Sequence, residues 1–383
     1  MLIVQLLLPR FLVVEIVLFI HFMQGQACNR VSKEPKECKV PFNGTIRYEP
    51  LILKDQKYLM PNKAKSIIIQ DNALVICPGA QLPTDNNRME VKCSRSGLIS
   101  DDENHLTVED LSCSRSIRES LQEANQVCGP DSQGKTVQVG WDIPLSSQFQ
   151  SQFSVCHNKD LEHTYYTEHV IKGSHITNRL KKRSRGFLEG RGFYTKDNAN
   201  DLYKKAIRKI REQGGNNIIT RGHLTPRADF VLSEMQEATY YFFNAVPQWS
   251  SINSGNWNHL EMSIRKLASK LKQDVHVQTG SYGISGYLGS NTIPIPKYVW
   301  KLVYADSKAI AFVGTNFVNE TITVENFCPQ DDANLCEETS WNFRDRTSAQ
   351  KGYIYCCTYQ SIKRSIPWIK HYDDNVGLLT NTV

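Results

Sequence analysis

The 383-residue sequence predicts an α+β fold preceded by a smaller, disulfide-braced, β-rich domain. Near the N-terminus, residues 65–69 and 73–77 are short β-branched runs ending at turn residues, which is typical of strands. Farther along, residues 257–271 place apolar side chains every three or four positions, as an amphipathic helix does. Residues 275–279, 298–304 and 309–313 alternate or run apolar like strands. The second part is therefore mixed α+β.

The length suits two domains of ordinary size. With 40% hydrophobic and 22% charged residues, the composition excludes disordered and fibrous proteins. We expect an N-terminal segment at 1–27, an accessory domain at 28–150 and a second domain at 151–383. The polar stretch 146–152 is a plausible junction between the two domains.

The first 27 residues resemble a secretory signal peptide. Arg10 precedes an apolar run from Phe11 to Phe22, and Gly25 and Ala27 have the spacing that signal peptidase requires. A membrane anchor is the alternative, but the run is shorter than the roughly 20 residues of a span. We expect a secreted protein without a membrane segment. The glycosylation sequons at 43–45 and 319–321 agree with this expectation.

Eleven cysteines also favour an oxidising compartment. They lack paired C-x-x-C motifs, so disulfides explain them better than zinc. Spacing alone does not give their pairing. Because eleven is odd, one thiol is free, or bridges two chains, or Cys28 is absent from the mature protein.

The net charge of +6 is unevenly distributed. Residues 28–150 carry 15 Lys and Arg against 16 Asp and Glu, whereas 151–383 carry 29 against 22. Thirteen of the basic residues lie in 172–211, partly on a helix expected between Asp197 and Gln213. This region is either a solvated helix face or, with nearby aromatic residues, a nucleic-acid surface.

Four short motifs follow one another between residues 221 and 261. In chain order they are Arg221-Gly222-His223, Asn244-Ala245-Val246-Pro247-Gln248, Asn253-Ser254-Gly255-Asn256-Trp257 and Leu260-Glu261. A single histidine after a strand is more often structural than catalytic, and an asparagine before a helix is usually an N-cap. The ordered set carries more information than any one motif.

This set resembles the DNA/RNA non-specific endonucleases of the ββα-metal (His-Me finger) class, the family of Serratia nuclease and mitochondrial endonuclease G. Their pattern is D-R-G-H, then N-x-x-P-Q, then N-x-x-x-W-x-x-L-E. The resemblance covers roughly 160–375 and looks closest to secreted arthropod double-stranded-RNA and salivary endonucleases. It implies a ββα-metal finger domain with a central antiparallel sheet and flanking helices.

Each motif residue suits a step of phosphodiester hydrolysis. His223, with an ordinary pKa near 6.5, can take a proton from water, and Arg221 lies on the same strand face to brace the phosphate. Asn253 is a neutral oxygen ligand suited to hydrated Mg²⁺, for which Mn²⁺ should substitute. The resemblance implies that Glu261, about 80° around the same helix, holds metal-bound waters. We expect Asn244 to tie the histidine loop to the metal site.

Two positions need separate comment. Thr220 stands where the bacterial pattern has aspartate, which removes a carboxylate beside the catalytic pair. The family also has a second phosphate-binding arginine upstream, in an R-x-aromatic context. Arg185-Gly186-Phe187 fits that context, so Arg185 is the expected substrate-binding residue.

The leading hypothesis is a secreted, Mg²⁺-dependent, sugar-non-specific endonuclease acting on DNA and RNA, including double-stranded RNA. The alternative is a secreted nucleic-acid-binding protein of the same fold with little turnover. A third class, an extracellular adhesion or structural protein, explains the cysteines but not the motifs. A binding protein needs only a basic surface, so the intact set of His223, Asn253 and Glu261 favours the enzyme.

Overall fold

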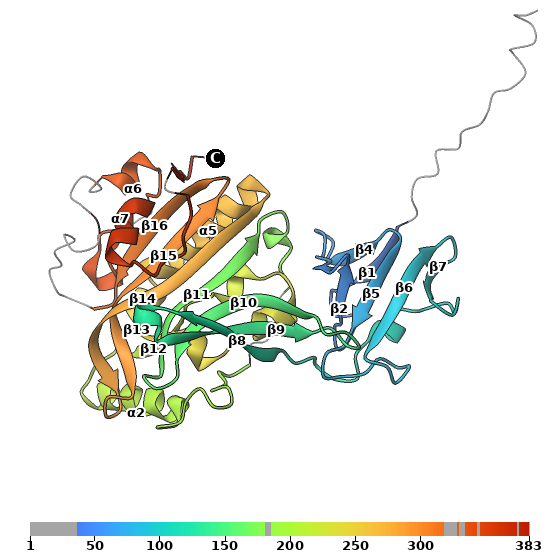
Figure 1. Cartoon of the computed structure of the whole chain (residues 1–383), viewed down its shortest axis with the longest axis horizontal. Coiled ribbons are helices and arrows are strands. Elements are labelled where there is room, and N and C mark those ends of the chain that lie inside the picture. The colour runs from blue at the N-terminus through green and yellow to red at the C-terminus, as the bar shows by residue number, and fades with distance from the viewer. Residues whose placement is uncertain are drawn as a thin grey trace, which may run out of the picture.

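The computed structural model describes residues 37–180, 185–317, 328, 334–342, 345–373 and 375–382. The expected signal peptide, Cys28, the sequon at 319–321 and residues 181–184 of the basic run lie outside these ranges. Within them the α+β fold is confirmed: a large antiparallel sheet is flanked by helices and joined to a smaller β-rich region (Figure 1).

The large sheet has the strand order β17-β16-β15-β14-β11-β10-β9-β8, and every neighbouring pair is antiparallel. Its strands are β8 (Ser120–Cys128), β9 (Gly134–Asp142), β10 (Phe149–Asn158), β11 (His163–Lys172), β14 (Asp274–Leu288), β15 (Ile293–Ala305), β16 (Lys308–Thr315) and β17 (Ile354–Cys357). A short strand, β18 (Gly377–Leu378), pairs in parallel with β16. The three strands expected after residue 274 are confirmed as β14, β15 and β16.

Six α-helices lie in the described residues. They are α2 (Ala199–Glu212), α3 (Ser233–Glu237), α4 (Ser250–Asn253), α5 (Asn256–Leu271), α6 (Leu335–Glu338) and α7 (Tyr359–Ser365). The two long helices, α2 and α5, are those that the apolar spacing predicts. The side chain of Asn198 caps α2 by accepting a hydrogen bond from the backbone of Asp201. Gly214, with φ of +78°, follows the end of the helix.

Helices α5 and α7 pack on opposite faces of the large sheet. Because side chains alternate along a strand, Val299 and Val303 of β15 face α5, whereas Trp300 and Leu302 face α7. Lys301 lies on the same face of β15 as the two valines, and only 1% of its side chain is exposed. A buried cation requires polar partners, which for Lys301 are Glu261, the Leu224 carbonyl and the Thr279 hydroxyl.

The N-terminal region consists of two small sheets. One pairs β1 (Cys38–Pro41) with β4 (Ser66–Ile69). The other has the order β3-β2-β5-β6-β7, with β2 (Leu51–Lys54), β3 (Lys57–Tyr58), β5 (Asn72–Ile76), β6 (Arg88–Ser94) and β7 (Gly97–Ser100). Strands β4 and β5 are the two β-branched runs of the sequence.

Ten of the eleven cysteines lie in the described residues, and they form five disulfides. The pairs are Cys38–Cys93, Cys77–Cys113, Cys128–Cys156, Cys328–Cys357 and Cys336–Cys356. The first two brace the N-terminal region and the other three brace the large sheet or its neighbouring segments. The eleventh cysteine, Cys28, lies outside the described residues.

The structure corrects the expected domain boundary at residue 150. Strands β8 and β9 precede that residue, yet both are hydrogen-bonded into the large sheet. The polar stretch 146–152 contains the end of the turn between β9 and β10 and the first residues of β10, so it is an exposed connection within one sheet and not a linker between domains. The large sheet begins at Ser120.

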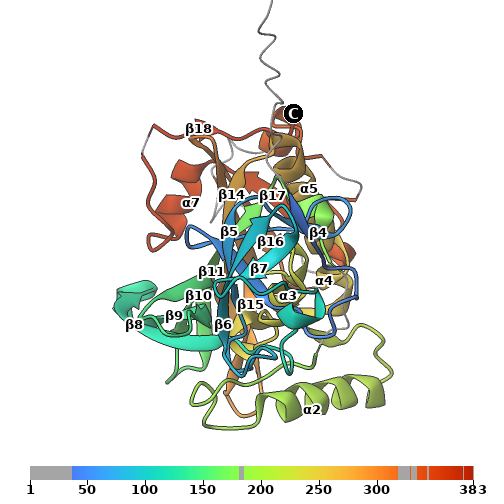
Figure 2. The ribbon, with the colours of Figure 1, turned by 90° about the vertical axis from the view of Figure 1, so that its right-hand side faces the viewer.

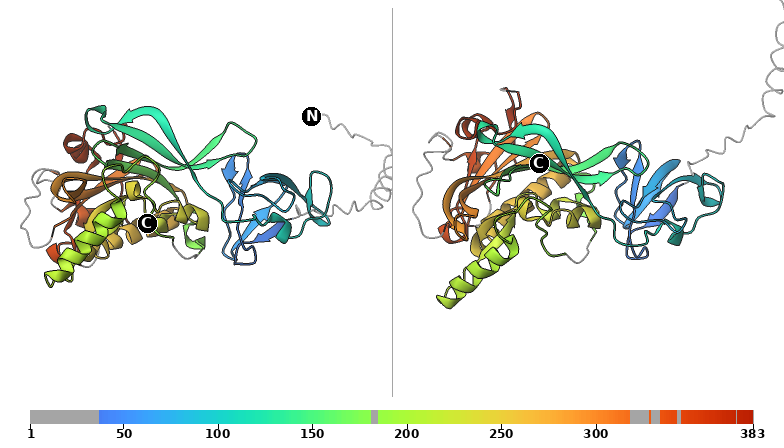
Figure 3. Two further views of the ribbon diagram at one scale, coloured as in Figure 1. Left: turned by 90° about the horizontal axis from the view of Figure 1, so that it is seen from below. Right: turned by 60° about the horizontal axis from the view of Figure 1, so that its bottom comes forward.

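The two parts of the molecule contact each other directly. Figures 1 and 3 show the N-terminal strands at one end of the large sheet, beside β9 and β10. One hydrophobic cluster contains residues of both parts, among them Ile52 and Val75 with Trp141 and Phe153. Figure 2 shows α2 along the lower edge of the molecule. No helix among the described residues is long and apolar enough to cross a membrane.

Candidate active site

Strands β12 (Ile219–His223) and β13 (Ala245–Trp249) form an antiparallel pair that leads through α4 into α5. Their register places His223 opposite Ala245 and Arg221 opposite Pro247. The first two sequence motifs therefore lie on neighbouring strands, and the remaining two lie on the helices that follow. This β-β-α arrangement is the one that the family resemblance implies.

His223 ends β12 in an aromatic environment. Its ring lies 4.9 Å from the Phe187 ring and 5.0 Å from the Tyr240 ring. Its Nε2 atom is buried and has no hydrogen-bond partner among the described residues. Burial, with a smaller contribution from the charge of Arg227, lowers the pKa of His223 to about 4. The imidazole is therefore neutral at neutral pH, more firmly than its ordinary pKa implies.

Arg221 lies on the same face of β12 as His223. Its guanidinium carbon is 5.9 Å from the centre of the Phe187 ring, which also contacts His223. Arg221 donates a hydrogen bond of 2.7 Å to Asn200 Oδ1 on α2 and lies 4.8 Å from the Tyr203 ring. These contacts hold a half-buried cation beside the histidine.

Asn244 supports the turn that follows His223. Its Oδ1 accepts a hydrogen bond from the backbone N–H of Thr225, and its Nδ2 donates to the carbonyl oxygens of Thr225 and Thr239. The side chain is fully buried. Asn244 thus contacts the loop that follows His223, and its expected role of tying that loop to the metal site stays a prediction.

Asn253 is the last residue of α4 and contacts Thr220. Its Nδ2 donates a 3.1 Å hydrogen bond to Thr220 Oγ1, which in turn donates to the carbonyl of Gln248 at 2.8 Å. An amide coordinates a cation through its oxygen, and the bond to Thr220 uses only the nitrogen. The threonine at the aspartate position of the motif therefore holds the side chain of Asn253, whose role as metal ligand stays a prediction.

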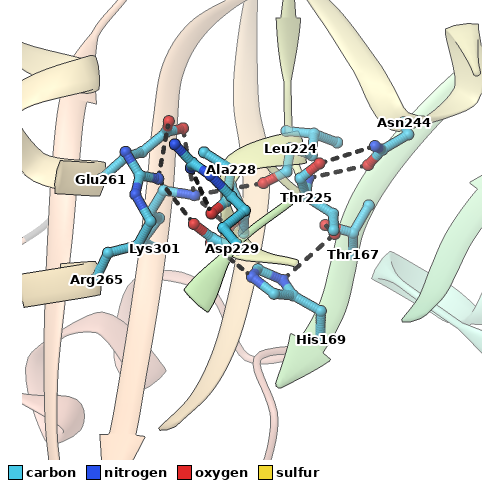
Figure 4. A network of polar contacts seen from close by, with 12 residues as sticks. Thr167, His169, Leu224, Thr225, Ala228, Asp229, Asn244, Glu261, Arg265 and Lys301 are labelled. Atoms are coloured by element: carbon cyan, nitrogen blue, oxygen red, sulfur yellow. Dashed lines mark hydrogen bonds and ion pairs between the residues drawn. The ribbon is translucent and has the colours of Figure 1, made fainter. Parts of the chain in front are cut away.

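Glu261 lies on α5 between two cations (Figure 4). Its Oε1 is 3.9 Å from Lys301 Nζ, and its Oε2 is 3.9 Å from Arg265 Nη1. Burial raises the pKa of Glu261 to about 7, whereas Lys301 and Arg265 favour the ionised form. A bound cation would favour the carboxylate further.

A buried polar network connects Glu261 to the histidine loop (Figure 4). Lys301 Nζ donates to the carbonyl of Leu224, the residue after His223, at 3.3 Å. One carboxylate oxygen of Asp229 accepts a 2.8 Å hydrogen bond from Arg265 Nη1, and the other lies 2.8 Å from His169 Nε2. The helix, the strand β15 and the loop are thereby held in one arrangement.

Sequence reasoning gave no role to Lys301, Arg265, Asp229 or His169, although Asp229 closely follows the Arg221-Gly222-His223 motif. Two of them left a signal: Arg265 is four residues after Glu261 on the same helix face, and Lys301 is the one charged residue in the expected strand 298–304. His169 had no such signal, because only the folded sheet brings it to Asp229.

Arg185 has a different partner. Its guanidinium forms an ion pair with Glu119 and lies 5.4 Å from the Tyr241 ring. Tyr241 also donates to Glu119, at 2.6 Å. Arg185 is two residues from Phe187 in the chain, and the Phe187 ring contacts His223. Its substrate-binding role stays a prediction.

The oxygen donors of this region fit a hard, largely hydrated cation. In the described part of the chain, no three His, Cys, Asp or Glu side chains cluster in a way that could hold a metal ion. Asn253 offers one amide oxygen and Glu261 one buried carboxylate, which suits Mg²⁺ because this ion usually keeps several of its waters. The same donors do not fit a zinc site.

Comparisons with known proteins point to one family. The family model for DNA/RNA non-specific endonucleases matches residues 132–361. The chain is 31% identical to a salivary endonuclease of Lutzomyia longipalpis over 312 residues, 73% of this chain and 72% of that one. It is 25% identical to the salivary protein Tsal1 of Glossina morsitans morsitans over 248 residues, 56% of this chain and 60% of that one.

Among solved structures, the comparison finds a chain from the crystal structure of the EndoG/EndoGI complex. It is 19% identical, with a TM-score of 0.32, and covers 49% of this chain and 82% of that chain.

Proposed function

Because this chain belongs to the DNA/RNA non-specific endonucleases, we propose that it is a secreted, Mg²⁺-dependent endonuclease that hydrolyses phosphodiester bonds in DNA and RNA, including double-stranded RNA. The observation that carries the proposal is the pairing of His223 with Arg221. The imidazole of His223 is neutral, and the guanidinium of Arg221 lies on the same strand face and contacts the same Phe187 ring. A base and a cation so placed serve attack by water on a phosphodiester.

In this proposal His223 accepts the proton of the attacking water. A neutral ring is required for that step, and the low pKa keeps the ring neutral. Arg221 faces the phosphate and stabilises the extra negative charge of the transition state with its N–H donors. Its bond to Asn200 limits how far it can move during the reaction.

Asn253 and Glu261 would hold the cation, Asn253 through Oδ1 and Glu261 through water. The bound Mg²⁺, or Mn²⁺ in its place, would neutralise charge on the phosphate oxygens and the leaving oxygen. Thr220 and Lys301 contribute by fixing these two side chains. Asn244 keeps the histidine loop in place.

The proposed substrate range follows from the type of contact available. The cationic side chains of α2 are exposed and suit phosphates, which DNA and RNA share. Double-stranded RNA is recognised largely through shape and backbone contacts, so such a surface can accept it. Secretion is supported by the signal-like N-terminus, the five disulfides and the salivary relatives.

Incubation of the purified protein with plasmid DNA and long double-stranded RNA tests the proposal. Both should be cleaved with Mg²⁺ or Mn²⁺, and EDTA should stop both reactions. Cleavage of neither substrate at any metal concentration, with binding retained, would favour the alternative of a binding protein.

A further inference from the structure

A cleft of about 1100 Å³ lies between the N-terminal region and the domain that carries the candidate active site. One wall is the loop between β1 and β2 together with Lys65. The other wall contains residues 176–180 and the last turns of α5. Two hydrogen bonds between the walls, Asn178 Nδ2 to the Pro61 carbonyl and Lys65 Nζ to the Arg179 carbonyl, fix their separation.

The cleft is strongly basic. Its described lining residues include five cations and one carboxylate: Arg47, Lys65, Arg179, Arg265, Lys266 and Glu49. Hydroxyl groups that could donate to an anion lie among them. Burial, and next the repulsion of Arg265, lower the pKa of Arg179, so the cations are close enough to act on one another.

Helix α5 connects the cleft to the candidate active site, because Arg265 belongs to the cleft wall and to the network around Glu261. Arg265 lines the cleft, and its Nη1 lies 3.9 Å from Glu261 and 2.8 Å from Asp229. Ser269, at the far end of the cleft wall, is eight residues beyond Glu261, or about 12 Å along the helix axis. That is the length of three to four nucleotide steps at about 3.4 Å each.

We propose that this cleft binds the phosphate backbone of the nucleic acid a few nucleotides from the bond that is cut. The N-terminal region is then part of the substrate-binding surface as well as a structural brace. The inference rests on the proposed nuclease function. The volume of the cleft exceeds the roughly 300–1,000 Å³ of small-molecule sites and suits a segment of a polyanion.

The test reverses the two cations of the cleft that are most exposed. Arg47 and Lys266 lie on opposite walls, and neither belongs to the buried network around Glu261. The variant is Arg47→Glu with Lys266→Glu. The matched control is Arg95→Glu with Lys308→Glu, which makes the same charge change at exposed positions outside the cleft.

Binding is measured by titrating a 30-base-pair duplex into full-length protein that also carries His223→Ala, at several salt concentrations. If each cation neutralises one phosphate, the log-log salt slope should fall in magnitude by about 1.8, because each phosphate contributes about 0.9. The control pair should keep the slope of the parent protein.

Cleavage is measured with His223 intact. The cleft variant should raise KM for long duplexes at least tenfold relative to the control pair. Hydrolysis of bis(p-nitrophenyl) phosphate, which is too short to reach the cleft, should stay within twofold of wild type. If wild type cleaves neither substrate, the proposed function fails, while the binding titration still tests the cleft.

Two results would overturn the cleft proposal. One is a cleft variant whose salt slope and KM match those of the control pair. The other is loss of heparin binding with unchanged nucleic-acid binding, which would assign the cleft to an anionic polysaccharide. Arg47→Ala with Lys266→Ala repeats the test without introduced negative charge, should the reversal perturb folding.

Asn43 requires an additional control, because it lines the same cleft and begins a glycosylation sequon. Its Oδ1 accepts a 2.6 Å hydrogen bond from Thr45 Oγ1, and both side chains are exposed. A glycan there would occupy part of the cleft. The charge reversal is therefore repeated with Asn43→Gln, where its effect should be at least as large.

Discussion

A histidine acts as a general base only while its ring is neutral, and the surroundings of His223 keep it so. Burial against two aromatic rings, and next the nearby charge of Arg227, disfavour the protonated form. At neutral pH the ring is therefore free to accept a proton from water. The same low pKa makes it a weaker base than an ordinary imidazole, so proton transfer to it relies on the charge stabilisation proposed for Arg221 and the cation.

His223→Ala should lower the cleavage rate about 10²–10⁴-fold, the usual contribution of a general base. Binding of duplex DNA should change little, because the base acts on water. The measurement is initial rate against affinity on the same preparation. A rate within tenfold of wild type would remove His223 from the mechanism.

Thr220→Val should weaken metal binding, because it frees the side-chain amide of Asn253. The hydroxyl now accepts from Asn253 Nδ2, and valine keeps the shape without the acceptor. Loss of such a supporting contact typically costs 10- to 100-fold in metal affinity or activity. The Mg²⁺ titration of cleavage should shift to higher concentration for Thr220→Val and stay near wild type for Thr220→Ser. Overlapping titrations for valine and wild type would mean that the hydrogen bond has no positioning role.

The motif residues could be read from the sequence because their spacing is local, within two strands and the two helices α4 and α5 that follow. The expectation that Asn253 and Glu261 share one helix was wrong, because Asn253 ends α4 and Glu261 lies on α5. The partners that come from distant strands could not be read in the same way. Lys301 reaches the site from β15, forty residues later in the chain, and His169 reaches Asp229 from β11. Only the packing of α5 on the sheet brings these side chains together.

At the scale of elements, α2 connects the proposed phosphate-binding surface to strand β12, which carries Arg221 and His223. Its first turn holds Arg221 through Asn200, while its cationic residues stay exposed. Periodicity predicts the helix but not which way its charged face points. Strands β8 and β9 are a second example. Their residues carry no motif, and they belong to the large sheet only because β9 pairs with β10 and β8 pairs with β9.

Reversal of Lys204, Lys205, Arg208 and Lys209 to glutamate should flatten the salt dependence of duplex binding. Each phosphate contact that is lost lowers the log-log slope by about 0.9. The side chains are exposed, so the fold should tolerate the change. A slope equal to that of wild type would make this side of α2 a solvated face and leave the interdomain cleft as the main basic surface.

At the scale of the whole molecule, the two parts share one hydrophobic cluster and direct hydrogen bonds. We therefore expect them to unfold together.

Several buried histidines lie within this structure. His157 is 1% exposed, contacts the rings of Phe193 and Phe243, and has a pKa lowered to about 3 by burial.

His157 should make the protein sensitive to acid. Above pH 6.5 the ring is neutral in both folded and unfolded chains, and its contribution to stability is fully present. As the pH falls below 6.5, the unfolded chain binds a proton that the folded chain does not accept until about pH 3, so stability falls. Between pH 7 and pH 5 this one group should lower the free energy of unfolding by about 2 kcal/mol.

Urea denaturation at the two pH values measures this loss. His157→Gln can still bond Thr164 but does not titrate, so it should reduce the loss by that amount. His105→Gln, at an exposed position, should leave the wild-type loss unchanged. If His157→Gln and His105→Gln lose the same stability as wild type, acid unfolding does not depend on His157.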